Sequence, residues 1–495
     1  MNRLMIFHLD LNYVCLTGDQ LRILLTKVAG MGYNAVLWEV ENKIRWETCP
    51  ECVWPEAMSK DEFRALLHYS RSLGLEPIPL LQTFGHGEYV LQHEAYHAFR
   101  ENPTRHDCYC TSNPDVRQFL RRWIREYLEL FGELHFFHFG GDEAYVFGSC
   151  PICSPRTRND LYAEHINALA EELLPLRIRP GIWCDMIMHY PEQVDFISRD
   201  FVIWDWNYWD GLTTSEPCRV TPEQINTIPE ATDKNGMPVP FYRSDFLKRK
   251  GYDVILCSAS RSAGESPFLP AFATHWRNII GAARKAAGLD LLGHCVTSWA
   301  IRLNDYEVQW PLLEMAPESE AHPELSPDEI LQLVCQRHFG SAEAVKALEA
   351  ASAFDSFVMR MTGVQWNHLK DSLPPPQGYL KKYIAELVEK NNASWHKFPD
   401  TLKRLAISIE EGREGLECLP QNPMRDAWHR RSKLQWQFCR VCDLAFGEKS
   451  DHVAARRELN ALRPAVEHLF MEWQTPLSAA HNTALLCDPL LEYLC

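Results

Sequence analysis

Short apolar segments alternate with amphipathic segments eight times along the first two thirds of the chain. Strand-like segments that are each followed by a helix or a long loop favour a parallel sheet, because parallel strands need crossover connections. We therefore expect an α/β fold, a (β/α)8 TIM barrel, with a doubly wound open sheet as the alternative. The expected strands are Leu4–Asp10, Ala35–Val40, Glu76–Leu81, His135–Phe139, Arg179–Cys184, Phe201–Asp205, Asp253–Ser258 and Leu292–Thr297.

The segments between these strands carry the signals of helices. Ser59 is followed by Glu62 and then by an apolar run, which is the pattern of a capping box at a helix start. The expected helices include Thr17–Met31, Ser59–Leu73, Asn113–Phe131 and Tyr162–Leu174.

Polar and aromatic residues gather at or just after the ends of the expected strands. In a barrel the loops that follow the strands build the active site, so this placement favours the barrel over the open sheet. The residues and stretches concerned are Glu39, Glu41, Gln82, His86, Asp142, Glu143, Trp183, Asp185, 204–209 and 299–307.

The pattern changes from about Pro323 onward, where long amphipathic stretches continue to the C-terminus and strand signals are scarce. The chain has 495 residues, enough for a barrel of roughly 250 residues or more and a second domain. We expect a catalytic barrel over residues 1–320 and a mainly helical C-terminal domain over residues 321–495, which braces the barrel or forms a homodimer.

The charge and the apolar runs exclude several classes of protein. The net charge is −16, which disfavours nucleic-acid binding because phosphate contacts need clustered Lys and Arg. No apolar stretch is long enough to span a bilayer, and the N-terminal run reaches His8 and Asp10 too soon for a signal peptide. Seventeen cysteines, an odd number, indicate reduced thiols. We expect a cytoplasmic protein without membrane or nucleic-acid partners.

The most specific motif is His-Phe-Gly-Gly-Asp-Glu at residues 138–143, directly after an apolar strand. Adjacent side chains on a regular strand point to opposite faces. Two glycines allow an abrupt turn as the strand ends, so that Asp142 and Glu143 can address the same pocket. The motif therefore predicts a pair of catalytic carboxylates.

This motif resembles the His-x-Gly-Gly-Asp-Glu signature of glycoside hydrolase family 20, the β-N-acetylhexosaminidases. The stretches at residues 32–38 and 79–86 resemble the second and third strands of that family. The segment from Gln82 to Val90 and the start at His8 are most similar to its hexosaminidase D branch. The resemblance covers roughly residues 4 to 316 and implies a retaining exo-β-N-acetylhexosaminidase, which acts on glycans with terminal GlcNAc or GalNAc.

The resemblance also implies a mechanism in which the substrate's own 2-acetamido group attacks the anomeric carbon, giving an oxazolinium intermediate. Glu143 would be the general acid and then the base that activates water, while ionised Asp142 would orient the acetamido group. His86 would link the acid to a further carboxylate, for which Glu41 is the best candidate and Glu39 competes. No cofactor is expected for catalysis.

Aromatic and polar side chains near the strand ends are expected to hold the sugar, because the apolar face of a pyranose packs well on Trp. Two departures from the family leave these contacts open. The first expected strand ends without an Arg, and residues 258–261 lack a Tyr, for which Tyr208 could substitute. The expected sugar contacts are Trp183, Asp185, Trp204, Trp206, Tyr208, Trp299, Arg302, Asp305 and Glu307.

Two Cys-x-x-Cys pairs follow the second and fourth expected strands, with Cys108 and Cys110 between them in sequence. Two such pairs can close a tetrahedral zinc site. The long spacing between them leaves free thiols as the alternative. We expect a structural zinc ion rather than a catalytic one, with the ligands Cys49, Cys52, Cys150 and Cys153.

Other functions remain open from the residues alone. One is a two-carboxylate glycosidase acting on sugars without an acetamido group. Another is a carbohydrate-binding barrel that has lost catalysis, against which the intact Asp142-Glu143 pair argues. A zinc hydrolase is disfavoured, because no His or Asp ligand set accompanies the cysteine pairs.

Overall fold

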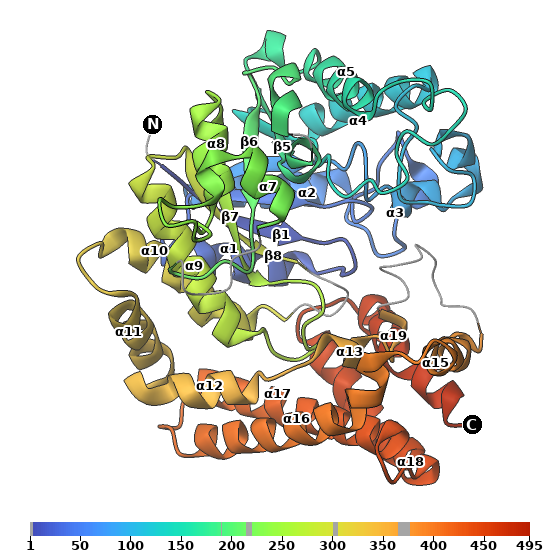
Figure 1. The fold of residues 1–495 in the computed structure, drawn as a ribbon, viewed down its shortest axis with the longest axis vertical. Coiled ribbons are helices and arrows are strands. Elements are labelled where there is room, and N and C mark those ends of the chain that lie inside the picture. The colour runs from blue at the N-terminus through green and yellow to red at the C-terminus, as the bar shows by residue number, and fades with distance from the viewer. Residues whose placement is uncertain (1–2, 190, 214–219, 300–304, 365–376) are drawn as a thin grey trace. The chain divides into compact units, whose positions relative to one another are not determined.

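In the computed structural model, eight parallel strands form a closed barrel in the order β1 to β8. The structure describes residues 3–189, 191–213, 220–299, 305–364 and 377–495, and Figure 1 shows the ribbon. Because β1 pairs with both β2 and β8, the sheet has no edge, which confirms the barrel and rules out the open sheet. The strands are β1 (Leu4–Asp10), β2 (Ala35–Glu39), β3 (Glu76–Leu80), β4 (Phe136–His138), β5 (Arg179–Trp183), β6 (Val202–Trp206), β7 (Asp253–Arg261) and β8 (Gly293–Ser298).

The strands are buried on both faces. All seven residues of β1 and all five of β2 are buried, as is usual for parallel strands that are packed on one side by helices and on the other by the barrel interior. Each expected strand overlaps an observed one, with ends that differ by up to three residues. The largest difference is at β7, which continues to Arg261.

Helices connect the strands, and local capping explains where they begin. Ser59 forms the expected capping box with Glu62 at the start of α2, and the Asn113 side chain accepts a hydrogen bond from the Asp115 amide at the start of α4. The helix that we expect from Tyr162 begins four residues earlier, at Arg158, because the Thr157 side chain caps α5. The helices of this part are α1 (Gly18–Met31), α2 (Lys60–Ser72), α3 (Glu88–Leu91), α4 (Pro114–Phe131), α5 (Arg158–Ala170), α6 (Asp185–Met188), α7 (Pro222–Thr227), α8 (Tyr242–Arg249) and α9 (Phe272–Gly288).

The C-terminal part is helical, as expected. In Figure 1 the long helices α16 and α17 run side by side, and α17 also packs on α18. Its buried apolar side chains include Leu402, Ile409, Phe438 and Leu459. The helices are α10 (Trp310–Ala321), α11 (Pro327–Phe339), α12 (Val345–Ala351), α13 (Ser356–Met359), α15 (Tyr379–Glu389), α16 (Ala393–Glu417), α17 (Pro423–Phe446), α18 (His452–Met471) and α19 (Pro476–Tyr493).

Internal contacts divide the chain into two compact units. The barrel unit comprises Met1–Asn12, Gly18–Ala259 and Arg277–Ser298, and the helical unit comprises Tyr13–Thr17, Ser260–Trp276 and Trp299–Cys495. The helical unit thus begins before residue 320, because α10 packs against α11. These units describe internal contacts, and the domain boundary that we expect at residue 320 stays a prediction.

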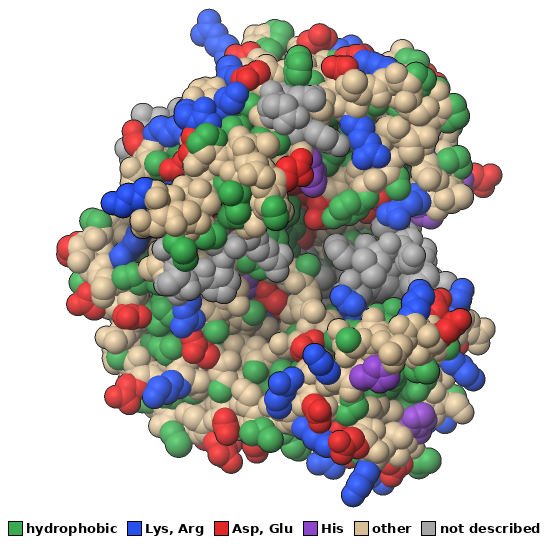
Figure 2. Space-filling view, viewed as in Figure 1, with side chains coloured by type: hydrophobic (Ala, Val, Ile, Leu, Met, Phe, Trp, Pro, Cys, Tyr) green, Lys and Arg blue, Asp and Glu red, His purple; other side chains and the backbone are tan. Residues whose placement is uncertain are grey.

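The surface and the helix lengths bear on possible environments. On the face drawn in Figure 2, basic and acidic side chains of the described residues are intermixed. Among the described residues, no helix combines the length and the apolar character needed to cross a bilayer.

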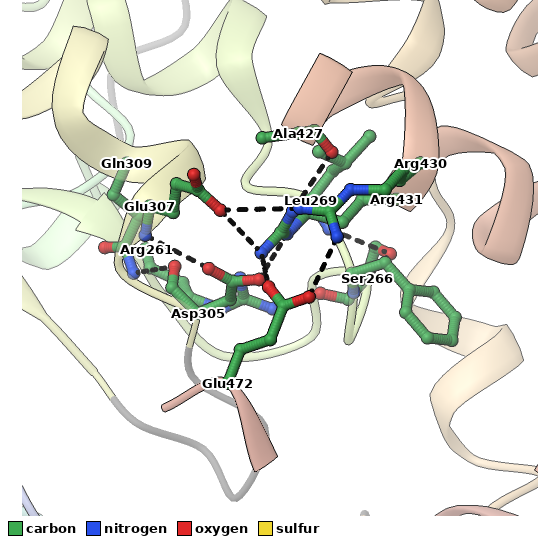
Figure 3. Close-up of polar contacts among 11 residues, drawn as sticks. Arg261, Ser266, Leu269, Asp305, Glu307, Gln309, Ala427, Arg430, Arg431 and Glu472 are labelled. Atoms are coloured by element: carbon green, nitrogen blue, oxygen red, sulfur yellow. Dashed lines mark hydrogen bonds and ion pairs between the residues drawn. The ribbon is translucent and has the colours of Figure 1, made fainter. Parts of the chain in front are cut away.

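One buried cation organises part of the helical unit. The Arg431 side chain on α17 has no exposed surface and forms ion pairs with Asp305, Glu307 and Glu472 (Figure 3). Its Nη1 also donates to the carbonyl of Ala427 at 3.2 Å. A buried ion pair is costly to break, because the partner that remains is a charge without compensation.

Replacing Arg431 by Met should therefore lower the free energy of unfolding by about 3–5 kcal/mol, since the Asp305 carboxylate would stay buried without its cation. Urea denaturation followed by circular dichroism measures this loss. Arg430→Met is the matched control on the same helix. Arg430 also pairs with Glu472 but is 56% exposed, so its loss should cost less than about 1 kcal/mol. Equal losses in the two variants would contradict the assignment.

Candidate functional site

The expected carboxylate pair lies directly after β4, and the backbone there turns as the two glycines predict. Gly140 and Gly141 have φ values of 64° and 89°, and Glu143 follows at 48°. A Cβ atom at Gly140 would lie 2.0 Å from Oε1 of Gln82. The turn therefore needs glycine both for its positive φ angle and for space, and it brings two consecutive carboxylates to one place.

His86 joins this pair. Its Nε2 atom lies 3.4 Å from Oδ2 of Asp142 and 3.4 Å from Oε2 of Glu143. The segment that carries His86 packs tightly on the pair, because a Cβ at Gly85 would lie 2.0 Å from the Asp142 carbonyl oxygen. His86 and Glu41 also have positive φ values, of 52° and 39°. Such backbone strain in residues other than glycine tends to cluster at functional sites.

The charge on His86 follows from its neighbours. Burial acts to lower the pKa of its imidazole, but the Asp142 charge and hydrogen bonds to Asp142 and Glu143 outweigh it and raise the pKa well above the ordinary value of 6.5. We therefore take His86 as an imidazolium at neutral pH, which offsets the repulsion between two adjacent carboxylates.

The two carboxylates differ in exposure. The Asp142 side chain is 8% exposed and the Glu143 side chain 31%. Within the described part of the chain, Oδ1 of Asp142 is buried and has no hydrogen-bond partner. The pair therefore offers one accessible carboxylate and one buried acceptor that can receive a donor.

Asp185 supports Glu143 from the end of β5. Its Oδ2 accepts a hydrogen bond from the Glu143 amide at 3.0 Å, and its Oδ1 accepts one from Nε1 of Trp206 at 3.2 Å. Burial, followed by the charge of Asp142, raises the pKa of the Asp185 carboxyl to about 7. Asp185 thus holds the backbone of Glu143 in place, and its expected contact with a sugar hydroxyl stays a prediction.

Glu39 is held by two partners inside the barrel. Its Oε2 lies 2.9 Å from Nε2 of His8, and its Oε1 accepts a hydrogen bond from Nε2 of Gln82 at 2.7 Å. Burial raises the pKa of the Glu39 carboxyl to about 7 and lowers the pKa of His8 to about 4. Between these values both groups are neutral, so their contact is a neutral hydrogen bond rather than an ion pair.

Glu41, the expected partner of His86, is buried. Burial, followed by the charge of Glu39, raises the pKa of its carboxyl well above 4.5. Among the described residues neither of its carboxyl oxygens has a hydrogen-bond partner, and the ion-pair partners of His86 are Asp142 and Glu143. A link from His86 to Glu41 stays a prediction.

The expected aromatic contacts differ in their surroundings. Trp183 and Trp204 are almost completely buried, and their ring centroids lie 4.4 Å and 5.0 Å from that of His138. Trp206 is half-buried and stacks on Tyr208 at 5.4 Å. Trp206 is thus more accessible than Trp183, Trp204 and Tyr208, which are all buried, and the contact of each with a sugar stays a prediction.

Three of the four remaining expected sugar contacts lie in the helical unit, and the fourth lies outside the described residues. Trp299 belongs to that unit, and Arg302 lies outside the described residues. Asp305 and Glu307 pair with Arg431 (Figure 3). Their local partner is therefore a buried guanidinium, and a role at the sugar stays a prediction.

Sequence reasoning missed Tyr145. Its hydroxyl is hydrogen-bonded to Glu143, and the residue is 68% exposed. A tyrosine two residues after the pair was the available signal, but nothing in the pattern showed that the turn folds it back toward Glu143.

The expected set of four cysteine ligands is not brought together. Cys150 and Cys153 lie with Cys110 and Glu101, whereas Sγ of Cys52 donates to the carbonyl of Cys49 at 3.0 Å. Cys49 and Cys52 follow β2, whereas Cys150 and Cys153 follow β4. The two pairs do not form one cluster.

The raised pKa of Glu39 predicts a pH-dependent stability. The folded state keeps the proton of Glu39 up to about pH 7, whereas the unfolded chain loses it near 4.5. The contribution of Glu39 to stability is therefore full below pH 4.5 and is lost as the pH rises to about 7. Relative to Glu39→Gln, the wild type should lose on the order of 2–3 kcal/mol between pH 4.5 and pH 7.5.

Urea denaturation of both proteins across this range measures the difference. Glu129→Gln is the control for the same chemical change at the surface, since the Glu129 side chain is 76% exposed. A constant difference for Glu39→Gln would show that this carboxyl is already ionised in the folded state at low pH.

Comparison with known proteins agrees with this geometry. Residues 41–227 match the family model of the glycosyl hydrolase family 20 catalytic domain. Hexosaminidase D of Bos taurus is 31% identical over 196 residues, which are 36% of this chain and 55% of that protein. Hexosaminidase D of Homo sapiens is 29% identical over 216 residues, 40% of this chain and 44% of that protein.

The chain thus spans about half the length of the curated relatives that it matches. A solved structure of β-N-acetylhexosaminidase from Bacteroides fragilis aligns with a TM-score of 0.47 and 18% identity, over 63% of this chain and 65% of that chain. At that similarity it adds nothing to the description of the site. Residues 41–227 of this chain are thus similar to the catalytic domain of glycosyl hydrolase family 20, and part of the chain is similar to hexosaminidase D.

Proposed function

We propose that this chain is a retaining exo-β-N-acetylhexosaminidase, which releases terminal GlcNAc or GalNAc from glycans through an oxazolinium intermediate. The observation that carries the proposal is the Asp142-Glu143 turn. One member of the pair is accessible, and the other holds a buried oxygen that lacks a hydrogen-bond partner among the described residues.

Substrate-assisted catalysis needs an acceptor for the acetamido N–H, because a negative charge there orients the carbonyl oxygen toward the anomeric carbon. Oδ1 of Asp142 is a buried acceptor of this kind. As the acetamido oxygen attacks, positive charge develops on the acetamido nitrogen. This charge strengthens the hydrogen bond that the acetamido N–H would donate to Asp142. An interaction that is stronger in the transition state than in the ground state accelerates the reaction.

Glu143 would donate a proton to the glycosidic oxygen and then remove one from the attacking water. Two neighbours act on this proton in opposite directions: the charge of Asp142 favours the protonated carboxyl, and the imidazolium of His86 favours the carboxylate. The Tyr145 hydroxyl and the hydrogen bond from the Glu143 amide to Asp185 would hold the carboxyl in position. No cofactor enters these steps.

Glu143→Gln should reduce kcat/KM by about 10²–10⁴-fold on glycosides with poor leaving groups, because general acid–base catalysis supplies an effect of this size. The loss should be smaller on aryl glycosides with acidic phenols, which depart without a proton. Steady-state kinetics on both substrate types measures the ratio. Glu171→Gln, at a side chain that is 68% exposed, is the control. Equal small losses on both substrates would refute the role of Glu143.

Asp142→Asn should depress the hydrolysis of N-acetylhexosaminides strongly and weaken inhibition by a thiazoline, which mimics the oxazolinium. Aryl glucosides, which have no acetamido group, should be poor substrates of the wild type and change little. Asp61→Asn, on an exposed helix surface, is the matched control. A two-carboxylate mechanism would instead be indicated if the wild type cleaved glucosides and N-acetylglucosaminides equally well.

A further inference from the structure

Four side chains with metal-binding atoms converge from two neighbouring loops of the barrel unit. Glu101 and Cys110 come from the segment between β3 and α4, and Cys150 and Cys153 come from the segment between β4 and α5. Their ligand atoms all lie within 4.8 Å of one another. Three of the four residues are buried and Cys150 is half-buried.

The distances match a tetrahedron around a metal ion. Sγ of Cys110 lies 3.6 Å from Sγ of Cys150 and 3.7 Å from Sγ of Cys153. Sγ of Cys153 lies 3.4 Å from Oε2 of Glu101. A Zn–S bond of about 2.3 Å and a Zn–O bond of about 2.1 Å give tetrahedral edges of about 3.8 Å between sulfurs and about 3.6 Å between sulfur and oxygen.

A disulfide does not explain this cluster. A disulfide bond joins two sulfurs at about 2.0 Å, and Cys110, Cys150 and Cys153 are all free thiols.

The backbone around the cluster is already arranged to support thiolates. The amide of Cys153 donates to Sγ of Cys150 at 3.3 Å, and the amide of Cys150 donates to Oε1 of Glu101 at 2.8 Å. Oγ of Ser112 lies 3.1 Å from Sγ of Cys153, where its hydroxyl can donate to a thiolate. Hydrogen bonds of this kind orient metal ligands and tune their basicity.

We propose that Cys110, Cys150, Cys153 and Glu101 bind one structural zinc ion. Three soft thiolates select zinc over magnesium or calcium, which prefer oxygen ligands. Four protein ligands fill a tetrahedral site and leave no position for a substrate or a reactive water. The site is independent of the proposed hydrolase activity, because it rests on its own residues and is tested by metal content.

The position of the site indicates what the ion stabilises. The segment with Glu101 and Cys110 also carries His86, and the amide of Tyr109, next to Cys110, donates to the carbonyl of Phe84 at 3.0 Å. The segment with Cys150 and Cys153 also carries Asp142 and Glu143. An ion shared by the two segments would tie the loop of His86 to the loop of the carboxylate pair.

The chain contains its own control in Cys49 and Cys52. They form a second buried Cys-x-x-Cys pair in the segment between β2 and α2. Among the described residues, no group of three or more metal-binding side chains includes them. A substitution at Cys49 therefore perturbs a buried thiol without removing a ligand of the proposed site.

The test is elemental analysis of the 495-residue chain, expressed with added zinc and purified without a metal-affinity step. The wild type and Cys49→Ser should each hold about one zinc ion per chain, whereas Cys110→Ser and Cys150→Ser should hold close to none. Cobalt substitution of the wild type should give a thiolate-to-cobalt absorption band that Cys110→Ser lacks. A wild type without zinc, or an equal loss in Cys49→Ser, would overturn the proposal.

A second measurement covers the case in which the variants fail to fold. The wild type is alkylated before and after treatment with a chelator, and the labelled cysteines are mapped by mass spectrometry. Chelation should expose Cys110, Cys150 and Cys153 to labelling and leave Cys49 and Cys52 unchanged. Labelling of the three thiols that is the same with and without chelator would refute the site.

Discussion

The pairing of β1 with β8 is the constraint on which the barrel unit depends. It closes a sheet in which the paired strands run parallel, so that their carboxyl ends lie on the same side. The pairings of β3 with β4 and of β4 with β5 bring the segments after these three strands together. These three segments carry His86, the Asp142-Glu143 pair and Asp185. In the unfolded chain these side chains would not be held close to one another.

Closure also concentrates acidic groups, and the protein manages their repulsion in two ways. Near the turn, His86 lies between two carboxylates as a cation. Deeper in the barrel, burial raises the pKa of Glu39 to about 7 and the pKa of Glu41 well above 4.5, which favours the neutral form of both carboxyls. Both effects reduce the repulsion that Asp142 experiences from neighbouring carboxyl groups, which suits a residue proposed to stabilise a developing positive charge on the substrate.

The two loops that carry these groups contain little regular structure, so they need other restraints. Close backbone packing at Gly85 supplies one of them. The cluster of three thiols and Glu101 would supply another, since a zinc ion shared by both loops adds strong bonds between them. The helical unit solves a similar problem with Arg431, whose charge joins carboxylates from two separate segments.

Local pattern alone was sufficient for the strands, for most helix starts and for the Gly140-Gly141 turn. Each of these depends on neighbours within a few residues: a short run of apolar side chains, a capping side chain at Ser59 or Asn113, or the freedom of glycine to adopt a positive φ angle. The carboxylate pair could be found in the same way, because its two residues are adjacent.

Only the tertiary structure decided the partners of the other site residues. Glu39 meets His8, 31 residues away, Cys153 meets Cys110 rather than Cys49, and Asp305 meets Arg431, 126 residues away. In each case the sequence shows a group that needs a partner but offers several of the right chemistry. Which of them comes within reach depends on how the strands close and how the helices pack, and those long-range contacts are not encoded in any local spacing.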